Sequence, residues 1–319
     1  MTLPIKNWWN KKIIVLGDLI ADVYVTGSIS RMSREAPIPI VVEQERNIVL
    51  GGAGNVVANI KALGGVPIPV GIVGRDTYGD SILNQLKNRA FIQRADMWQT
   101  TTKTRIISKG SNSKQQLFRL DVHNSSTYDH TEQTISNLYA AMEQASALII
   151  SDYREGTINN EIIREVNKIA LRGYPVFVDS PRFNEFHRAI LLKPNEQELM
   201  HYDKPAKETF NEVGTYFVGS TDCKNLLVTR GSVGMVLFRR EVIPVNVPAH
   251  GTNELTDVTG AGDTVIATFT LATLGGFDPV DAMKIANVAG GLKVKKFGTA
   301  IVDFSELYEE LNGDEYGLE

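Results

Sequence analysis

The stretch that decides how this sequence is interpreted reads Asp257-Val258-Thr259-Gly260-Ala261-Gly262-Asp263-Thr264, and the weakly polar run 265–274 follows it. Glycines allow close backbone approach to a ligand, and a helix that starts here presents unpaired amides and a positive dipole end to an anion. Asp263 would then be placed to accept a proton from an attacking hydroxyl, while the amides stabilise a transferring phosphoryl group. Taken alone, the same pattern is also typical of an aspartate N-cap after a glycine turn.

Short apolar runs that stop at polar residues surround this motif and predict buried strands. They lie at 12–16, 147–150, 176–178, 189–192 and 225–228, and helical patterns occupy 54–63, 131–144 and 160–171. Strand–helix alternation predicts an α/β fold with a mostly parallel central sheet covered by helices on both faces. Ligands of such sheets bind beyond the carboxyl ends of the strands. The residues expected at that edge are Asp18, Asp152, Asp179, Asn195 and Arg230.

Two stretches interrupt this alternation. Residues 23–50 and 100–120 have strand-like spacing without helices between them. We predict that together they form a small antiparallel β lid, discontinuous in sequence. The main domain would then comprise residues 1–22, 51–99 and 121–319.

Composition narrows the class of protein. The 319 residues are 43% hydrophobic and 22% charged, with a net charge of −4, which is typical of a globular chain and argues against a dedicated nucleic-acid binder.

The single cysteine, Cys223, excludes an internal disulfide and is interpreted as a small core residue. The apolar run 13–16 is too short for a signal peptide, and the run 264–277 is too short to span a bilayer. We therefore expect a cytoplasmic protein without a membrane partner.

Two further segments carry candidate chemistry. Gly51-Gly52-Ala53-Gly54-Asn55 directly precedes a helix; it fits a dinucleotide fingerprint poorly, and a hinge with helix entry is the simpler interpretation. Lys193-Pro194-Asn195-Glu196-Gln197-Glu198 places an amide and a carboxylate three residues apart, where they would hold water around Mg²⁺. By itself this second segment is better explained as a capping box. No Walker, HExxH or GxSxG motif is present.

In combination these segments resemble the ribokinase family of sugar kinases over essentially the whole chain. The order is Gly17-Asp18, the glycine segment at 51–55, the segment at 193–198, Thr229-Arg230-Gly231, and the terminal glycine-rich motif. Further stretches at 17–22, 30–39, 119–121, 151–153 and 296–299 look like the kinases that phosphorylate O1 of D-glycero-D-manno-heptose 7-phosphate with ATP. Those kinases are often fused to a nucleotidyltransferase. Because the sequence ends soon after the kinase pattern, we expect that second activity to be absent.

The resemblance implies ATP and Mg²⁺ as cofactors and a role for each matching position. Asp263 would be the base, with Gly260, Ala261 and Gly262 forming the anion hole. Asn195 and Glu198 would organise Mg²⁺ and phosphate, with water between them and the ion. Thr229 and Gly231 would lie along ATP, and Asn287 would lie near the adenine. Asp18, Asp22, Gly52 and Asn55 would hold sugar hydroxyls, and the lid would pair with that of a second subunit in a homodimer. Asp257 is interpreted either as loop architecture or as a site for a monovalent cation.

A sugar that already carries a phosphate calls for charge-assisted bonds from the protein. The candidates are Lys103, Arg105 and Arg119 on the lid, and Arg182 in a strand-end loop. Departures from the heptose kinases concern the substrate more than the reaction: Arg34 replaces a usual Pro, Lys193 a common Thr, and the segment 180–182 a usual Asp-Pro-Lys. The alternatives are a kinase for another sugar or sugar phosphate, and a non-catalytic sugar sensor, which would be expected to lack the base.

Overall fold

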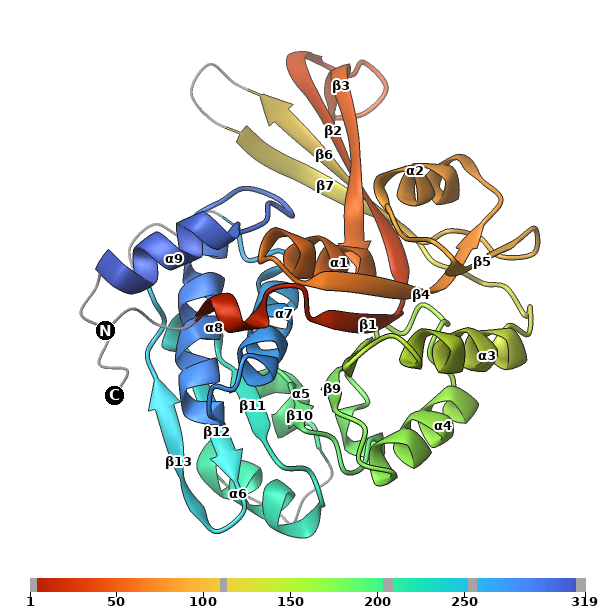
Figure 1. The fold of residues 1–319 in the computed structure, drawn as a ribbon. Coiled ribbons are helices and arrows are strands. Elements are labelled where there is room, and N and C mark those ends of the chain that lie inside the picture. Colours follow the sequence, from red (N-terminus) through yellow and green to blue (C-terminus); the bar gives the residue numbers. More distant parts are fainter. Residues whose placement is uncertain (1–4, 110–113, 203–208, 252–256, 314–319) are drawn as a thin grey trace.

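The central sheet runs through the whole molecule. The computed structural model describes residues 5–109, 114–202, 209–251 and 257–313. The strands of this sheet are β1 (Lys12–Gly17), β4 (Val66–Gly74), β5 (Phe91–Ala95), β8 (Ala147–Ser151), β9 (Val176–Asp179), β10 (Leu191–Leu192), β11 (Leu226–Thr229), β12 (Met235–Arg239) and β13 (Val242–Val247). Over the described residues their order is β13-β12-β11-β10-β9-β8-β1-β4-β5 (Figure 1). From β5 to β11 neighbouring strands are parallel, and only β12 and β13 are antiparallel, so the expected mostly parallel sheet is confirmed.

Helices cover both faces of this sheet (Figure 1). One hydrophobic core holds side chains of α1 (Ala53–Ala62), α2 (Thr77–Gln85), α7 (Ala261–Leu274), α8 (Pro279–Val294) and α9 (Phe304–Gly313). The other holds those of α3 (Thr131–Met142), α4 (Asn160–Leu171), α5 (Glu196–Met200) and α6 (Phe210–Ser220). Short 3₁₀ turns lie at Ile5–Trp8, Phe183–Glu185 and Gly231–Val233.

Strand β1 shows why its residues 13–16 are all apolar. Ile13 and Val15 pack into the first core, whereas Ile14 and Leu16 pack into the second, and all four are buried. A parallel strand covered on both faces has no solvent side, so both alternating sets of side chains must be apolar. Cys223 is buried in the second core, in agreement with its interpretation as a core residue.

The lid is a second sheet that projects from the main body (Figure 1). Its strands are β2 (Leu19–Met32), β3 (Pro39–Gly52), β6 (Thr102–Lys109) and β7 (Lys114–Val122), in the order β3-β2-β6-β7. The pairs β2/β3 and β6/β7 are antiparallel, as predicted, but β2 and β6 join the two pairs in parallel, which the sequence analysis did not anticipate. Parallel pairing follows because both strands leave the main sheet at the same edge, β2 directly after β1 and β6 after the β5 region.

The chain returns from the lid to the main domain at Gly52. Its backbone has φ 55° and ψ −133°, a conformation open essentially to glycine, and a Cβ there would lie 2.4 Å from the carbonyl oxygen of Asp18. The next amide, that of Ala53, donates to the same carbonyl oxygen at 2.9 Å and starts α1. Glycine at this position therefore allows the lid strand and the helix to meet over Asp18.

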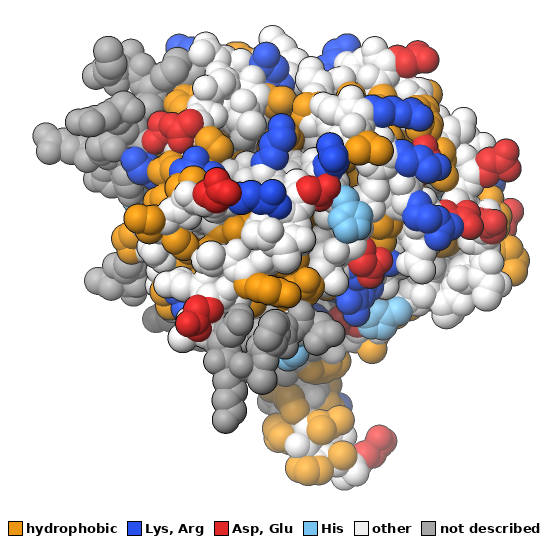
Figure 2. All heavy atoms as spheres, turned by 90° about the horizontal axis from the view of Figure 1, so that it is seen from below, with side chains coloured by type: hydrophobic (Ala, Val, Ile, Leu, Met, Phe, Trp, Pro, Cys, Tyr) orange, Lys and Arg blue, Asp and Glu red, His pale blue; other side chains and the backbone are white. Residues whose placement is uncertain are grey.

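The face seen from below Figure 1 carries charged side chains of both signs, interspersed with apolar and uncharged ones (Figure 2). Among the helices of the described residues, none is long and apolar enough to cross a membrane.

Candidate active site

A cavity of about 570 Å³ opens where several strands of the main sheet end and α7 begins. Its walls include Asp152, Asp179 and Asn195, three of the five residues expected at this edge. Asp18 and Arg230 do not line it. The strand-end rule therefore located the cavity, although it did not tell which of the polar side chains face it.

Helix α7 begins in the glycine-rich motif. Its N-cap is Gly260, which has a left-handed backbone (φ 77°), and a Cβ there would lie 2.5 Å from Nδ2 of Asn55. Asp263 is the third residue of the helix and makes no capping hydrogen bond with its side chain. The N-cap interpretation of this aspartate is therefore wrong, because the N-cap is Gly260, three residues earlier.

Asp263 is held by two donors from distant parts of the chain. Its carboxylate accepts a hydrogen bond from Nδ2 of Asn55 at 2.7 Å and another from the Tyr153 hydroxyl at 2.6 Å. Its side chain is buried, and burial raises the pKa of Asp263 to about 7, although the Tyr153 hydrogen bond opposes the shift. The negative charge of Asp179 adds to the rise. A carboxylate with a pKa near neutrality is suited to accept a proton during catalysis.

Lys193 brings a positive charge to the start of α7. Its ammonium lies 2.9 Å from Oδ2 of Asp179, and 3.2 Å from where a Cβ of Gly262 would be. The Ala261 amide donates to the Val258 carbonyl at 3.2 Å, whereas the Gly262 amide follows within the first helical turn, where amides lack intrahelical acceptors. A buried ammonium beside a helix N-terminus supplies positive charge and donors that suit an anion.

Two of these residues were missed as functional by the sequence analysis. Tyr153 and Lys193 both stand in quoted motifs, but neither was given a role. The signal for Lys193 was its replacement of a common threonine, which changes the local charge. For Tyr153 there was no local signal, because its partner Asp263 is 110 residues away in the chain.

Asn195 and Glu198 form the capping box that the sequence allowed. Oδ1 of Asn195 accepts from the Glu198 amide, and Oε2 of Glu198 accepts from the Asn195 amide, both at 2.8 Å. Both side chains nevertheless line the cavity. Burial raises the pKa of Glu198, and the charge of Asp179 raises it further. A divalent cation would relieve that repulsion, so these oxygens fit Mg²⁺ held through water. Within the described ranges no group of three or more His, Cys, Asp or Glu side chains gathers as a metal site.

The residues for which the resemblance implies nucleotide contacts also line the cavity. Thr229, Gly231 and Asn287 all line it. The Asn287 side chain donates to the carbonyl of Pro248 at 2.8 Å, which fixes its orientation at the wall.

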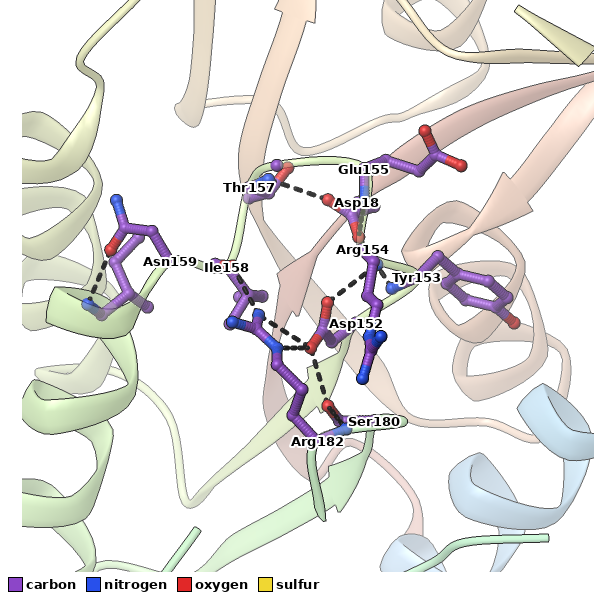
Figure 3. Close-up of polar contacts among 12 residues, drawn as sticks. Asp18, Asp152, Tyr153, Arg154, Glu155, Thr157, Ile158, Asn159, Ser180 and Arg182 are labelled. Atoms are coloured by element: carbon purple, nitrogen blue, oxygen red, sulfur yellow. Dashed lines mark hydrogen bonds and ion pairs between the residues drawn. The ribbon is translucent and has the colours of Figure 1, made fainter. Parts of the chain in front are cut away.

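Asp18, expected to contact the sugar, is engaged by backbone amides of a neighbouring loop. Its carboxylate accepts three backbone hydrogen bonds, from the amides of Tyr153 (2.7 Å), Glu155 (3.2 Å) and Thr157 (2.9 Å), as Figure 3 shows. Burial and the charge of Asp152 raise the pKa of Asp18, while these amides oppose the rise. Asp18 therefore shapes the loop that carries Tyr153 toward Asp263.

Arg182 is likewise occupied by the protein. Its guanidinium donates to Oδ2 of Asp152 at 2.9 and 3.1 Å and to the carbonyl of Ile158 at 2.6 Å (Figure 3). Ser180 donates to the same carboxylate oxygen at 2.7 Å. This arrangement leaves Arg182 poorly placed to bind a substrate phosphate.

On the lid, Asp22 and Arg105 form a buried ion pair, with Oδ1 and Nη1 2.7 Å apart. Arg119 pairs with Asp121 at 2.8 Å and is half exposed. The ammonium of Lys103 lies 4.9 Å from the ring centroid of Tyr153, so the lid contacts the residue that holds Asp263. Asp257, by contrast, lies outside the cavity wall and bonds to the amides of Thr259 and Gly298.

Comparison with known proteins agrees with this architecture. The model of the pfkB family of carbohydrate kinases matches residues 10–305. The bifunctional protein HldE of Azorhizobium caulinodans is 36% identical over 312 residues, covering 92% of this chain and 63% of the relative. HldE of Aliivibrio fischeri is 36% identical over 324 residues, covering 98% and 66%. The chain thus spans less than two thirds of the length of these relatives.

Solved structures share the fold at low sequence identity. Phosphofructokinase-2 from Escherichia coli, in complex with substrates and products, superposes with a TM-score of 0.75 at 15% identity, covering 95% of this chain and 99% of that one. Ribokinase from Arabidopsis thaliana, complexed with ribose and ATP, gives 0.69 at 20% identity with the same coverage. The ribokinase-like fold expected from the motifs is confirmed.

The raised pKa of Asp263 predicts a pH-dependent stability. Unfolded, this carboxylate titrates near 4, and folded it titrates near 7, so folding favours its protonated form and stability falls as pH rises between these values. Asp263→Asn removes the buried charge. We expect the unfolding free energy of the variant, relative to wild type, to increase by about 2–3 kcal/mol from pH 5 to pH 8 in urea titrations.

The exposed Asp96→Asn serves as the matched control and should show no such trend, since its side chain is 80% exposed. A difference between Asp263→Asn and wild type that stays constant with pH would contradict the raised pKa.

Proposed function

The chain belongs to the pfkB family of carbohydrate kinases and is a sugar kinase, and we propose that it transfers the γ-phosphoryl group of ATP to O1 of D-glycero-D-manno-heptose 7-phosphate. The observation that carries the proposal is the buried Asp263, with a pKa of about 7, beside the anion site at the start of α7. The relatives named HldE and the motifs shared with heptose 7-phosphate kinases support the choice of sugar.

The proposed reaction uses the groups around α7 in a simple order. The sugar oxygen attacks the γ-phosphorus and its proton passes to Asp263, while the bond to the β-phosphate oxygen breaks and ADP leaves with that electron pair. The Gly262 amide and the Lys193 ammonium stabilise the charge on the transferring phosphoryl oxygens. Ala261 contributes its amide if that amide exchanges the Val258 carbonyl for the phosphoryl oxygen.

Tyr153 and Asn55 keep the proposed base oriented and hydrogen-bonded before the sugar arrives. Asn195 and Glu198, with Asp179 beside them, would hold Mg²⁺ through water. When bound, that ion neutralises phosphate charge. The nucleotide would extend from there along Thr229 and Gly231 toward Asn287.

The lid carries cationic side chains that could bind the phosphate of the sugar. In the register of the sheet, Asp22 lies opposite Lys103, and Lys103 opposite Asp121; in the next row of the same face, Arg105 lies opposite Arg119. These cations therefore share the face that carries Asp22. Arg105 is buried in its pair with Asp22, whereas Arg119, although paired with Asp121, is half exposed. We therefore assign the sugar phosphate to Arg119 and Lys103.

A kinase for another sugar or sugar phosphate uses the same machinery and differs only in this lid face. A non-catalytic sensor would bind sugar and nucleotide without turnover. Release of ADP in the presence of each sugar separates these possibilities.

Asp263→Asn preserves size but removes basicity. We expect turnover of ATP with heptose 7-phosphate to fall by roughly 10²–10⁴, the usual contribution of a positioned general base, with far smaller changes in substrate affinity. A coupled ADP-release assay measures it, and Asp96→Asn should keep wild-type turnover. Near-normal turnover of folded Asp263→Asn would show that another group is the base.

Arg119→Gln tests the second phosphate. Losing a charge-assisted hydrogen bond should raise the KM for heptose 7-phosphate by about 10–100-fold, and leave the KM for ATP and for the unphosphorylated heptose nearly unchanged. Arg46→Gln is the control, because Arg46 pairs with Glu43 on the lid and lies opposite Val25, on the other face of the sheet from Arg119. Equal catalytic efficiency of wild type on phosphorylated and unphosphorylated sugars would refute the phosphate site.

We further propose that the lid mediates a homodimer. Large apolar side chains are exposed on it: Ile29, Met32, Ile38, Val42, Phe118 and Leu120. Both β3 and β7 are edge strands that present unpaired backbone groups. Sedimentation at micromolar concentration should give a dimer, and Phe118→Lys should shift it toward monomer. Ile243→Lys on β13, 86% exposed, should leave it dimeric; a monomeric wild type would rule out the dimer but not the kinase.

A further inference from the structure

Lys293, near the end of α8, is a fully buried lysine outside the cavity wall. None of its surface is exposed, and its ammonium donates to the carbonyl oxygen of Gly298 at 2.7 Å. Burial lowers the pKa of Lys293, while the nearby charges of Asp257 and Asp263 oppose that shift. An ammonium taken out of water is costly unless polar groups compensate for it. Its environment must therefore be built to hold a cation.

The side chain of Lys293 lies beside the loop that leads into α7. The Cε atom of Lys293 lies 3.7 Å from where a Cβ of Gly260 would be, so the side chain reaches the N-cap of that helix. The Asp257 amide donates to the carbonyl of Val294, next to Lys293, at 3.1 Å. Among the described residues no acid lies within ion-pair distance of this lysine.

The Asp257 carboxylate binds the same turn at Gly298. Its Oδ1 accepts from the Thr259 amide and its Oδ2 from the Gly298 amide, both at 2.9 Å. Burial would raise the pKa of Asp257, but these hydrogen bonds and the Lys293 charge hold it below its ordinary value. The turn at Gly298 is thus bound twice, its amide by the carboxylate and its carbonyl by the ammonium.

The sequence left two interpretations of Asp257, loop architecture or a monovalent-cation site. Here both carboxylate oxygens already accept amides, and the neighbouring carbonyl of Gly298 already accepts an ammonium. The Gly298 carbonyl, one of the oxygens that could ligate a cation, is thus already bound to the Lys293 ammonium. A further cation beside that carbonyl would face the positive charge of Lys293, so these oxygens do not fit an added cation.

We propose that the Lys293 ammonium is a built-in cation, so that this kinase works without an activating monovalent ion. Lys293 is a positioning residue: it fixes the 257–260 loop against the turn at Gly298, and through Gly260 it sets where the amides of Ala261 and Gly262 point. The inference rests on the proposed kinase function, but cation binding itself is measurable without turnover.

The experiment compares wild type with Lys293→Met, which keeps the length of the side chain and removes its charge. Each protein is measured in K⁺, NH₄⁺ or N-methylglucammonium chloride at equal ionic strength. Thermal unfolding reports cation binding, since a ligand of the folded state raises the midpoint. Turnover of ATP with the sugar reports the positioning of the anion hole. Lys295→Met is the control, an exposed lysine one residue beyond the same helix.

We expect the wild-type unfolding midpoint and turnover to be the same in all three salts, with turnover within twofold. Lys293→Met should lose at least tenfold in turnover in N-methylglucammonium and regain several-fold in K⁺ or NH₄⁺, with a raised midpoint in those salts. A merely structural lysine would lower stability without creating cation dependence.

Wild type activated more than fivefold by K⁺, or stabilised by it over N-methylglucammonium, would overturn the proposal, as would Lys293→Met with wild-type turnover in N-methylglucammonium. If Lys293→Met does not fold, the wild-type salt series decides alone. If no sugar is phosphorylated, the kinase proposal fails, while the wild-type unfolding midpoints still test the built-in cation.

Discussion

A single buried carboxylate, that of Asp263, is the constraint to which the rest of the site is fitted. It lies in the first turn of α7 and is held by Asn55 from α1 and by Tyr153 from the loop after β8. Burial without donors would leave a costly charge, and too many donors would depress its basicity. Two hydrogen bonds in a dry site leave the pKa near neutrality, which is useful to a base but costs stability.

Each of the acids around Asp263 is compensated by its own cation or by backbone amides. Asp179 is paired with Lys193, Asp152 with Arg182, and Asp18 with backbone amides. These acids gather because the parallel strands end at one edge, and their mutual repulsion must be compensated by cations or donors. The result is a site with local positive charge beside α7, in a chain whose net charge is −4. It is this local arrangement, not the overall charge, that suits a nucleotide phosphate.

In the proposed function, the lid connects substrate recognition with the reacting centre. Lys103 approaches the ring of Tyr153, whose hydroxyl bonds to Asp263, and the Asp22–Arg105 pair lies on the same face of the lid. In the proposed mechanism, a sugar bound under this face excludes water from Asp263, which protects ATP from hydrolysis. The glycine at position 52 lets the lid rejoin the helix that carries Asn55, so lid and base share one structural junction.

Local features of the sequence were enough to predict several parts of this protein. Helix 160–171 was predicted with its observed bounds, because its 3.6-residue periodicity ends shortly before Gly173. The apolar strands with polar ends predicted the parallel sheet and the position of the cavity, since both follow from burial on two faces and from chain direction. The glycine-rich motif likewise marked the start of α7, because few residues other than glycine adopt the backbone of Gly260.

Only the tertiary structure decided which polar side chains remain available to a ligand. Asp18 is engaged by the amides of a loop, and Arg182 is engaged by Asp152. Tyr153 and Lys193 converge on α7, and the buried Lys293 ammonium bonds to the carbonyl of Gly298. The parallel pairing of β2 with β6 is equally a matter of distant chain segments. A residue type states what a side chain can bond to, but the fold decides its partner. Asn55 and Tyr153, for example, reach Asp263 from 208 and 110 residues away in the chain.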